Sequence, residues 1–274
     1  MAHVSICIPT YNNASDVDRL FDSISEQTYT DYEVIITDDS TNDEIAELVK
    51  EKAPDARYIH NENKLGHIFN WNEAISLATG DYVKIMFSDD WFTFPDSLEK
   101  MVRLLDDTPD ASMIFTGSRQ VQLDSDDREY RDRCATEEFI SGLKSDYRLL
   151  FSTNQIGAPS ATMYRRDDAI RFDEKSNWAS DVFLYFEILG RNSKFIYSTE
   201  PLISIGEHKN QYTESFTSND KRIFYDYRYM YRKYSLSTSD MCKNHYKEVY
   251  LHPYMKECIK RPCRQLRDLL LKRK

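Results

Sequence analysis

The sequence has little glycine and none of the repetition that marks a specialised chain. Only 7 of its 274 residues are glycine, and we find neither a low-complexity stretch nor an internal repeat of about 20 to 50 residues. Hydrophobic residues make up 41% of the chain, which is enough for a sizeable core. These features argue against fibrous and repeat architectures and predict one large globular domain or two small ones.

Long apolar runs are also missing. None reaches the roughly 18 residues that a membrane-spanning helix needs. The start of the chain lacks the order of basic and then apolar residues typical of a signal peptide. The five cysteines are odd in number, widely spaced and without a CxxC pair, so neither a disulfide framework nor a zinc site is supported. We therefore expect a cytoplasmic protein with reduced thiols.

Positive charge is scarce everywhere except at the end of the chain. The formal net charge is -10, yet residues 258–274 hold seven Lys or Arg against one Asp, a sum of +6. The other 257 residues therefore sum to -16. A body this acidic argues against nucleic acid as a partner, because phosphates attract cationic surfaces. It can still bind a nucleotide if a divalent metal ion supplies the positive charge.

Two common phosphate-binding loops are absent. The sequence has no GxGxxG after its first apolar segment and no GxxxxGK[ST] anywhere. A dinucleotide-dependent dehydrogenase and a P-loop enzyme are thereby disfavoured.

Strands and helices alternate in the first third of the chain. Apolar segments at 4–8, 33–37, 57–59 and 82–87 predict strands, and helical spacing predicts helices near 15–24, 45–49, 68–75 and 95–105. This alternation predicts a parallel sheet covered by helices on both faces. Ligands bind at the carboxyl ends of such strands, here directly after Ile8, Thr37 and Phe87.

The pattern is looser beyond residue 111. We expect a strand at 111–116, a polar loop at 124–138, a helix at 139–151, a strand at 161–164, a helix at 179–189, short strands at 195–198 and 202–205, and helices from 220 onward.

Five Asp-Asp pairs occur in the chain, and their positions separate them. Only Asp38-Asp39 and Asp89-Asp90 directly follow apolar strands; the others end a helix or lie in polar turns. Two adjacent carboxylates at a ligand-binding edge repel each other unless a cation is present. Oxygen-rich sites of this kind suit Mg²⁺ or Mn²⁺.

Four segments in order resemble family 2 glycosyltransferases, which have the GT-A fold. They are Val4–Asn12 (VSICIPTYN), Val34–Ser40 (VIITDDS), Asn70–Val83 (NWNEAISLATGDYV) and Phe87–Asp90 (FSDD). The spacing agrees over about 100 residues and the match weakens after residue 117. The resemblance implies an α/β fold, a Rossmann-like αβα sandwich with a mostly parallel sheet, followed by a C-terminal helical extension.

The resemblance also implies residue roles at the donor site. Pro9, Tyr11 and Asp39 match positions that hold the nucleoside, Asp89 the position near the ribose and diphosphate, and Asp90 the metal ligand. Ser88 departs from the pattern, because many relatives carry Asp there.

Three further residues have two interpretations each. Asp181 resembles the general base at a helix start, and it also suits a first-turn aspartate that interacts with the helix dipole. His208 lies where relatives place a histidine near the metal, but lone loop histidines are commonly solvated. Lys64 is either a cation near the diphosphate or a surface lysine.

Three tryptophans lie close to these motifs. Trp71 is expected in the core. Trp91 either lines the sugar pocket or has a structural role, and Trp178 either stacks on an acceptor sugar or has a structural role; the structural interpretation is preferred for each.

The implied function is metal-dependent, inverting transfer of a sugar from a nucleoside diphosphate to a hydroxyl group. Mn²⁺ or Mg²⁺ would be the cofactor, a UDP-sugar the favoured donor, and a saccharide or lipid-linked saccharide the acceptor, in bacterial surface polysaccharide or glycolipid synthesis.

Residues 1–117 would bind the donor, 118–215 the acceptor, and 216–274 would form a helical region. Its basic segment 258–274 is either a helix on the inner face of the cell membrane, or a solvated tail or oligomer contact. The alternative function is an inactive relative that binds a nucleotide sugar.

Overall fold

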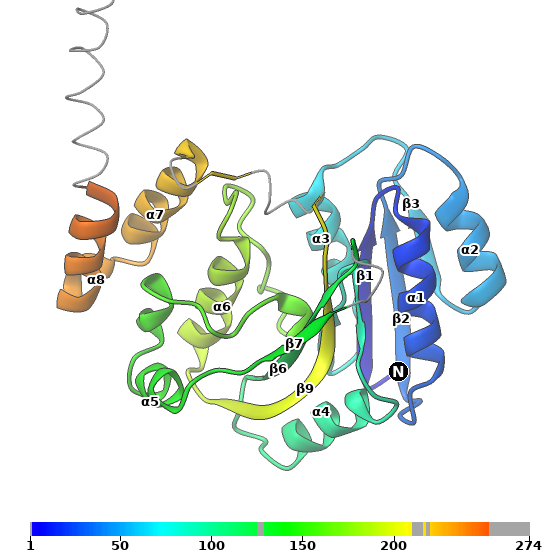
Figure 1. Ribbon diagram of the computed structural model, residues 1–274, viewed down its shortest axis with the longest axis horizontal. Helices are drawn as coiled ribbons and strands as arrows, with labels where there is room; N and C mark the ends of the chain where they lie inside the picture. The colour runs from blue at the N-terminus through cyan, green and yellow to red at the C-terminus, as the bar shows by residue number, and fades with distance from the viewer. Residues whose placement is uncertain (1, 125–128, 210–215, 218–219, 252–274) are drawn as a thin grey trace, which may run out of the picture.

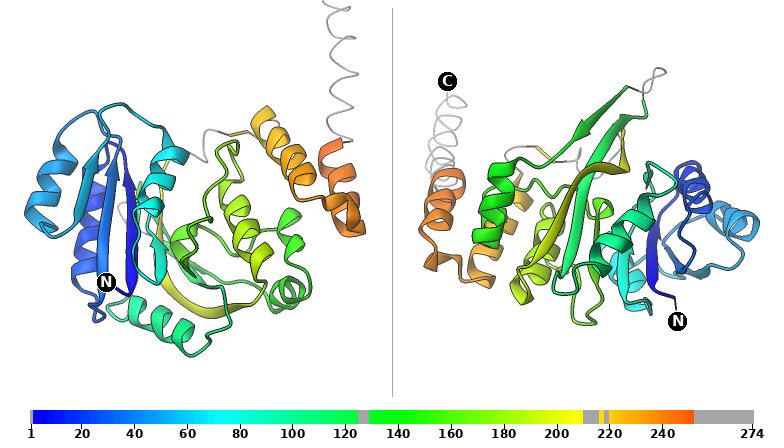
Figure 2. Two further views of the ribbon diagram at one scale, coloured as in Figure 1. Left: turned by 180° about the vertical axis from the view of Figure 1, so that it is seen from behind. Right: turned by 90° about the horizontal axis from the view of Figure 1, so that it is seen from below.

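The protein is a three-layer α/β structure with a helical extension (Figures 1 and 2). The computed structural model describes residues 2–124, 129–209, 216–217 and 220–251. The basic segment 258–274 lies outside the described residues.

The first half of the fold alternates strand and helix as the sequence predicts. Its elements are β1 (Val4–Thr10), α1 (Ala14–Ser25), β2 (Tyr32–Asp38), α2 (Glu44–Lys52), β3 (Arg57–His60), α3 (His67–Ser76) and β4 (Tyr82–Ile85). Strands β3, β2, β1 and β4 pair in that order, and all three pairings are parallel. Their carboxyl ends therefore meet at one edge, the edge at which ligands bind in such sheets.

The second half extends the same sheet with mixed pairings. Its elements are β5 (Asp90–Phe92), α4 (Ser97–Asp106), β6 (Met113–Gln122), β7 (Tyr130–Arg133), α5 (Glu137–Ser145), β8 (Thr162–Arg165), α6 (Ser180–Arg191), β9 (Phe195–Glu207), α7 (Lys221–Lys233) and α8 (Asp240–His245). The full order is β3-β2-β1-β4-β8-β6-β9-β5, with β7 paired to β6. The predicted α/β class, with a parallel first half and C-terminal helices, is confirmed.

Two apolar cores cover the two faces of the sheet. One buries α1, α2 and α4, through residues such as Leu20, Ile45 and Leu98. The other buries α3, α5 and α6, through residues such as Ile75 and Phe183. The helical extension packs on the second core, to which α7 contributes the buried Met230 and several tyrosines.

Three expectations about elements are corrected. The expected loop at 124–138 contains β7, and the expected helix at 139–151 is divided into α5 and a 3₁₀ helix, Tyr147–Phe151. The two strands expected at 195–198 and 202–205 are one long strand, β9, whose register against β6 shifts at Gly117. The short strand β5 is not apparent in the sequence pattern.

In the described part of the chain, no helix combines the length and the apolar character needed to cross a lipid bilayer.

Candidate functional site

A large crevice opens at the carboxyl ends of the first strands and extends beneath α6 and α7. Its volume is about 1310 Å³. All eight residues singled out from the sequence lie on its wall: Pro9, Tyr11, Asp39, Lys64, Asp89, Asp90, Asp181 and His208. Residues up to 199 positions apart in the chain (9 and 208) therefore share one cavity.

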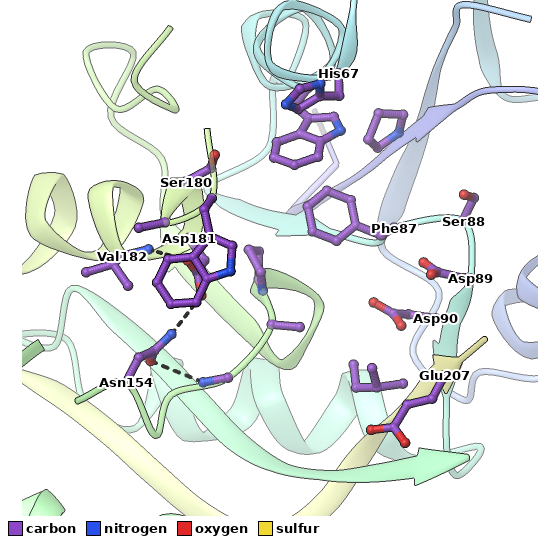
Figure 3. Close-up of a pocket in the computed structure, with 18 of the residues that line it drawn as sticks. His67, Phe87, Ser88, Asp89, Asp90, Asn154, Ser180, Asp181, Val182 and Glu207 are labelled. Atoms are coloured by element: carbon purple, nitrogen blue, oxygen red, sulfur yellow. Dashed lines mark hydrogen bonds between the residues drawn. The ribbon is translucent and has the colours of Figure 1, made fainter. Parts of the chain in front are cut away.

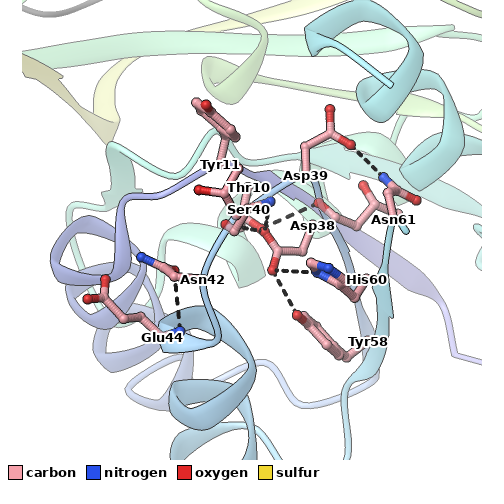
Figure 4. A network of polar contacts seen from close by, with 12 residues as sticks. Thr10, Tyr11, Asp38, Asp39, Ser40, Asn42, Glu44, Tyr58, His60 and Asn61 are labelled. Carbon is pink, nitrogen blue, oxygen red and sulfur yellow. Dashed lines mark hydrogen bonds and ion pairs between the residues drawn. The ribbon is translucent and has the colours of Figure 1, made fainter. Parts of the chain in front are cut away.

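The two carboxylates of the first acidic pair have different surroundings (Figure 4). Asp38 is fully buried and accepts hydrogen bonds from Thr10 Oγ1 (2.9 Å) and the Tyr58 hydroxyl (2.7 Å), so it ties β1, β2 and β3 together. Asp39 reaches the cavity wall. It accepts hydrogen bonds from Asn61 Nδ2 at 2.8 Å and from the backbone N–H of Gly66 at 2.8 Å. These contacts fix the Asp39 carboxylate at the end of β2.

Tyr11 and Lys64 form the outer wall of the same end. The Tyr11 ring is 45% exposed, and Lys64 Nζ lies 3.6 Å from its centroid, which is a cation–π contact. An exposed aromatic face beside a cation and a fixed carboxylate suits a ligand with a flat ring and a negatively charged group.

The second acidic pair lies where β5 meets β9 (Figure 3). Asp90 is 3% exposed, and its register partner is Ile205 of β9. Burial raises the pKa of the Asp90 carboxyl well above its usual range, and the charge of Asp89 raises it further. His208, just beyond β9, brings its Nε2 to 3.6 Å from Asp89 Oδ2. The pair thus places two carboxyl groups side by side, at least one of which is costly to ionise, with an imidazole beside them.

A buried lysine stands behind this pair. Lys84 of β4 is fully buried and donates a hydrogen bond to the Ser160 carbonyl, while Ser160 Oγ hydrogen-bonds the Asp90 carboxylate. Burial lowers the pKa of the Lys84 ammonium to about 7, although the charge of Asp90 acts in the opposite direction. Lys84 gives partial compensation for the acidic pair from the protein side.

The acidic pair offers a small donor set for a metal ion. Among the described residues, no group of three His, Cys, Asp or Glu side chains is arranged to hold an ion. One or two carboxylates are nevertheless what Mg²⁺ uses when substrate phosphate oxygens complete its coordination, and carboxylates also suit Mn²⁺. The residues present therefore fit a metal that binds together with a diphosphate.

Asp181 lies across the cavity, in the first turn of α6 (Figure 3). Its carboxylate accepts hydrogen bonds from Asn154 Nδ2 (2.7 Å) and from the N–H of Val182 (2.8 Å). Desolvation raises the pKa of Asp181 to about 6; these hydrogen bonds lower it and the charge of Asp226 raises it. A carboxyl group with a pKa just below neutrality is suited to act as a general base.

Sequence reasoning missed residues that complete this side of the cavity. Asn154 orients Asp181 and accepts a hydrogen bond from the N–H of Ile156 (3.0 Å), in a loop where Gly157 has φ +88°. Tyr227 and Met230 reach the wall from α7. The glycine three residues after Asn154 marks a turn, but nothing local identifies the α7 residues.

The three tryptophans near the motifs differ in their surroundings. Trp178 is 39% exposed on the wall, 6.3 Å from Tyr227 between ring centroids. Trp71 packs against Phe87 and also lines the cavity. Of the two interpretations of Trp91, the structure supports the structural one: its ring lies under the Arg19 guanidinium at 4.4 Å, outside the cavity lining. Successive side chains of a strand point to opposite faces, so Asp90 and Trp91 cannot both face the ligand.

The fold and crevice thus define an α/β protein with a nucleotide-compatible site at the carboxyl ends of its strands. Residues 5–172, more than half of the chain, match the model of glycosyl transferase family 2. The chain belongs to this family, and the resemblance stated from the sequence is confirmed.

A named relative of this chain is a glycosyltransferase. The amylovoran biosynthesis glycosyltransferase AmsB of Erwinia amylovora is 28% identical over 72% of this chain and 67% of its own length. Three other curated relatives are matched over only 18% to 59% of their own length, so the chain spans less than two thirds of each of them.

Two solved structures share the fold. The first is Staphylococcus aureus TarS (residues 1-349) in complex with UDP-GlcNAc, at 18% identity and a TM-score of 0.60, over 78% of this chain and 61% of that one. The second is the mannosyltransferase PcManGT of Pyrobaculum calidifontis with GDP-Man and Mn²⁺, at 20% identity and a TM-score of 0.56, over 77% and 59%. The GT-A architecture implied by the sequence is therefore confirmed.

Proposed function

We propose that this chain is an inverting glycosyltransferase that moves a sugar from a nucleoside diphosphate to a hydroxyl group of an acceptor. One observation carries the proposal: a single cavity holds the Asp89-Asp90 pair and, across from it, Asp181 with its raised pKa. Metal-compatible carboxylates and a potential base are the two components that a single displacement at an anomeric carbon needs.

The donor would lie along the first strands. Asp39, Tyr11 and Pro9 would hold the base and ribose, and Lys64 would approach the diphosphate. Asp90, with Asp89 and His208, would hold Mn²⁺ or Mg²⁺ against the phosphates. A bound metal ion neutralises the charge that develops on the leaving diphosphate. TarS was solved with UDP-GlcNAc and PcManGT with GDP-Man and Mn²⁺, so a UDP-sugar is favoured here and a GDP-sugar is the alternative.

Asp181 would accept the proton of the attacking hydroxyl group. Its Oδ2 is oriented by Asn154, and its position on the first turn of α6 faces the cavity (Figure 3). Trp178 and Tyr227 would bind the acceptor sugar, since both rings line this side. Attack from the side opposite the leaving group would invert the anomeric carbon.

The acceptor proposed is a saccharide or lipid-linked saccharide of a bacterial surface polymer. The name of AmsB, amylovoran biosynthesis, supports this class. Contact with a membrane would involve residues 258–274, and co-sedimentation of the full chain and a 1–257 truncation with anionic liposomes tests it.

The central experiment is calorimetric titration of UDP, GDP and dTDP, with and without Mn²⁺, into wild type and Asp90→Ala. Metal-dependent binding of one nucleotide, lost in the variant, is expected. Release of that nucleotide from its sugar conjugate then distinguishes transfer from binding by an inactive relative. Binding that is unaffected by Mn²⁺ and by Asp90→Ala would contradict the proposed metal site.

A further inference from the structure

The backbone just before α6 is held by a carboxylate from α7. Asp226 has no exposed surface. It accepts hydrogen bonds from the N–H groups of Asn177 (2.9 Å), Trp178 (2.6 Å) and Ala179 (2.9 Å), and from the Asn177 side-chain amide (2.9 Å). Helix α7 lies beside α6 (Figures 1 and 2).

These contacts fix the residues that lead into α6 but do not reach the N–H groups of its first turn. Its N-cap residue is Ala179, which has no side-chain oxygen to accept from the first turn. A buried carboxylate is strongly unfavourable unless it is hydrogen-bonded, and here several N–H groups converge on it. Its negative charge also lies at the N-terminal end of α6, where the helix dipole favours an anion. The carboxylate and segment 177–179 therefore fix each other.

We propose that Asp226 is a positioning residue for the acceptor side of the cavity. By fixing 177–179 it sets the direction of the Trp178 ring and of Asp181, the first-turn carboxylate two residues further on. The family match ends at residue 172, so α7 lies beyond the matched region. The effect of Asp226 on turnover rests on the proposed function, whereas its effect on the order of segment 177–179 does not.

Helix α7 also contacts α6 and the residues before it through side chains other than Asp226. These contacts allow the positioning of segment 177–179 to be tested separately from the packing of α7. Lys233 Nζ contacts Asp173 and Glu187, each at 2.8 Å. The Tyr234 ring stacks on Phe186 with centroids 4.6 Å apart. Removal of the Asp226 carboxylate therefore leaves α7 on α6, and Lys233→Met is a matched control that weakens docking without contacting 177–179.

The first test is amide hydrogen exchange in wild type, Asp226→Ala and Lys233→Met. Asp226→Ala should speed exchange in peptides covering 177–179 at least about tenfold, because strong charge-assisted hydrogen bonds are lost. Lys233→Met should leave exchange there as in wild type. Equal exchange at 177–179 in wild type and Asp226→Ala would overturn the proposal.

The second test measures turnover and binding in the same three proteins. With UDP-GlcNAc and GDP-mannose as donor probes, release of nucleoside diphosphate should fall about 10- to 100-fold in Asp226→Ala only, because a small misplacement of a reacting group is costly. Affinity for the nucleotide with Mn²⁺ should stay unchanged. Faster exchange with turnover equal to that of Lys233→Met would overturn the catalytic part. If wild type itself releases no diphosphate, the proposed function fails, and the exchange data alone decide the positioning.

Discussion

The carboxyl group of Asp181 is held in surroundings that favour its protonated form. Desolvation raises its pKa from 3.8 to about 6, against the opposing effect of its hydrogen bonds. A general base must be deprotonated before it accepts a proton. The same shift that makes Asp181 effective near neutral pH therefore also makes its ionised form unfavourable to the fold.

Asp181→Asn should abolish transfer and leave donor binding nearly intact. In wild type, the turnover rate should rise with pH through about 6, as the carboxylate forms. We expect a loss of about 10²- to 10⁴-fold in the variant, the range typical of a missing general base. Steady-state rates between pH 5 and 8, with nucleotide affinity as the control, check this. Near-normal turnover would remove Asp181 from the mechanism.

Asp181→Asn should also stabilise the protein at high pH. The folded-state pKa is raised, so this group's contribution is present below pH 3.8 and is lost as the pH rises through 6. At pH 8 the variant should therefore exceed wild type by about 1–3 kcal/mol in free energy of unfolding, with a smaller difference at pH 5. Urea unfolding at both pH values measures it. A difference independent of pH would mean that the Asp181 pKa is not raised.

Local sequence predicted the residues that follow strands but not those brought in by long-range packing. Asp39 and Asp90 were recognisable because each directly follows an apolar segment or a motif. Asp226 lies in a helix of ordinary amphipathic pattern, and its partners are about 48 positions away. No local pattern encodes that contact.

At the scale of elements, the junction of β5 and β9 shapes the acidic site. Gly206 of β9 passes so close to β5 that a Cβ there would lie 2.5 Å from the backbone oxygen of Asp89. Only glycine permits this approach. The three-residue strand β5 was too short to predict from periodicity, and β9 was divided in two because exposed Thr199 and Glu200 interrupt its apolar pattern.

Gly206→Ala should therefore force β5 and β9 apart. We expect a loss of about 1–3 kcal/mol in free energy of unfolding, as for other overpacked sites, together with weaker Mn²⁺-dependent nucleotide binding. Gly190→Ala is the control: its Cβ would come no closer than 3.4 Å to Tyr147, and alanine in a helix should add up to about 1 kcal/mol. Urea unfolding and calorimetry would be run on both. Unimpaired nucleotide binding in Gly206→Ala would show that the close approach is not needed.

At the scale of the whole molecule, the crevice draws on both halves of the sheet and on the helical extension. The parallel half was predictable, since strand and helix alternate regularly there. The order of β8, β6, β9 and β5 was not, because antiparallel insertions leave no periodic signature.

Ligand binding should stabilise this assembly as a unit. Mn²⁺ and the correct nucleotide together, at about 100 times the dissociation constant, should contribute about 2.7 kcal/mol and raise Tm by about 5–10 °C. Either component alone should have a much smaller effect. Thermal unfolding of wild type and Asp90→Ala tests this, and an equal shift in both proteins would argue against Asp90 as the metal ligand.

The pairing of β5 with β9 also has a consequence for synthesis. Asp90 emerges from the ribosome more than 100 residues before Ile205, its register partner. A nascent chain that ends before β9 holds the first strands of the sheet but has neither the backing for its acidic pair nor His208. On the proposed function, donor binding with metal would therefore be acquired only after residue 208 has been made.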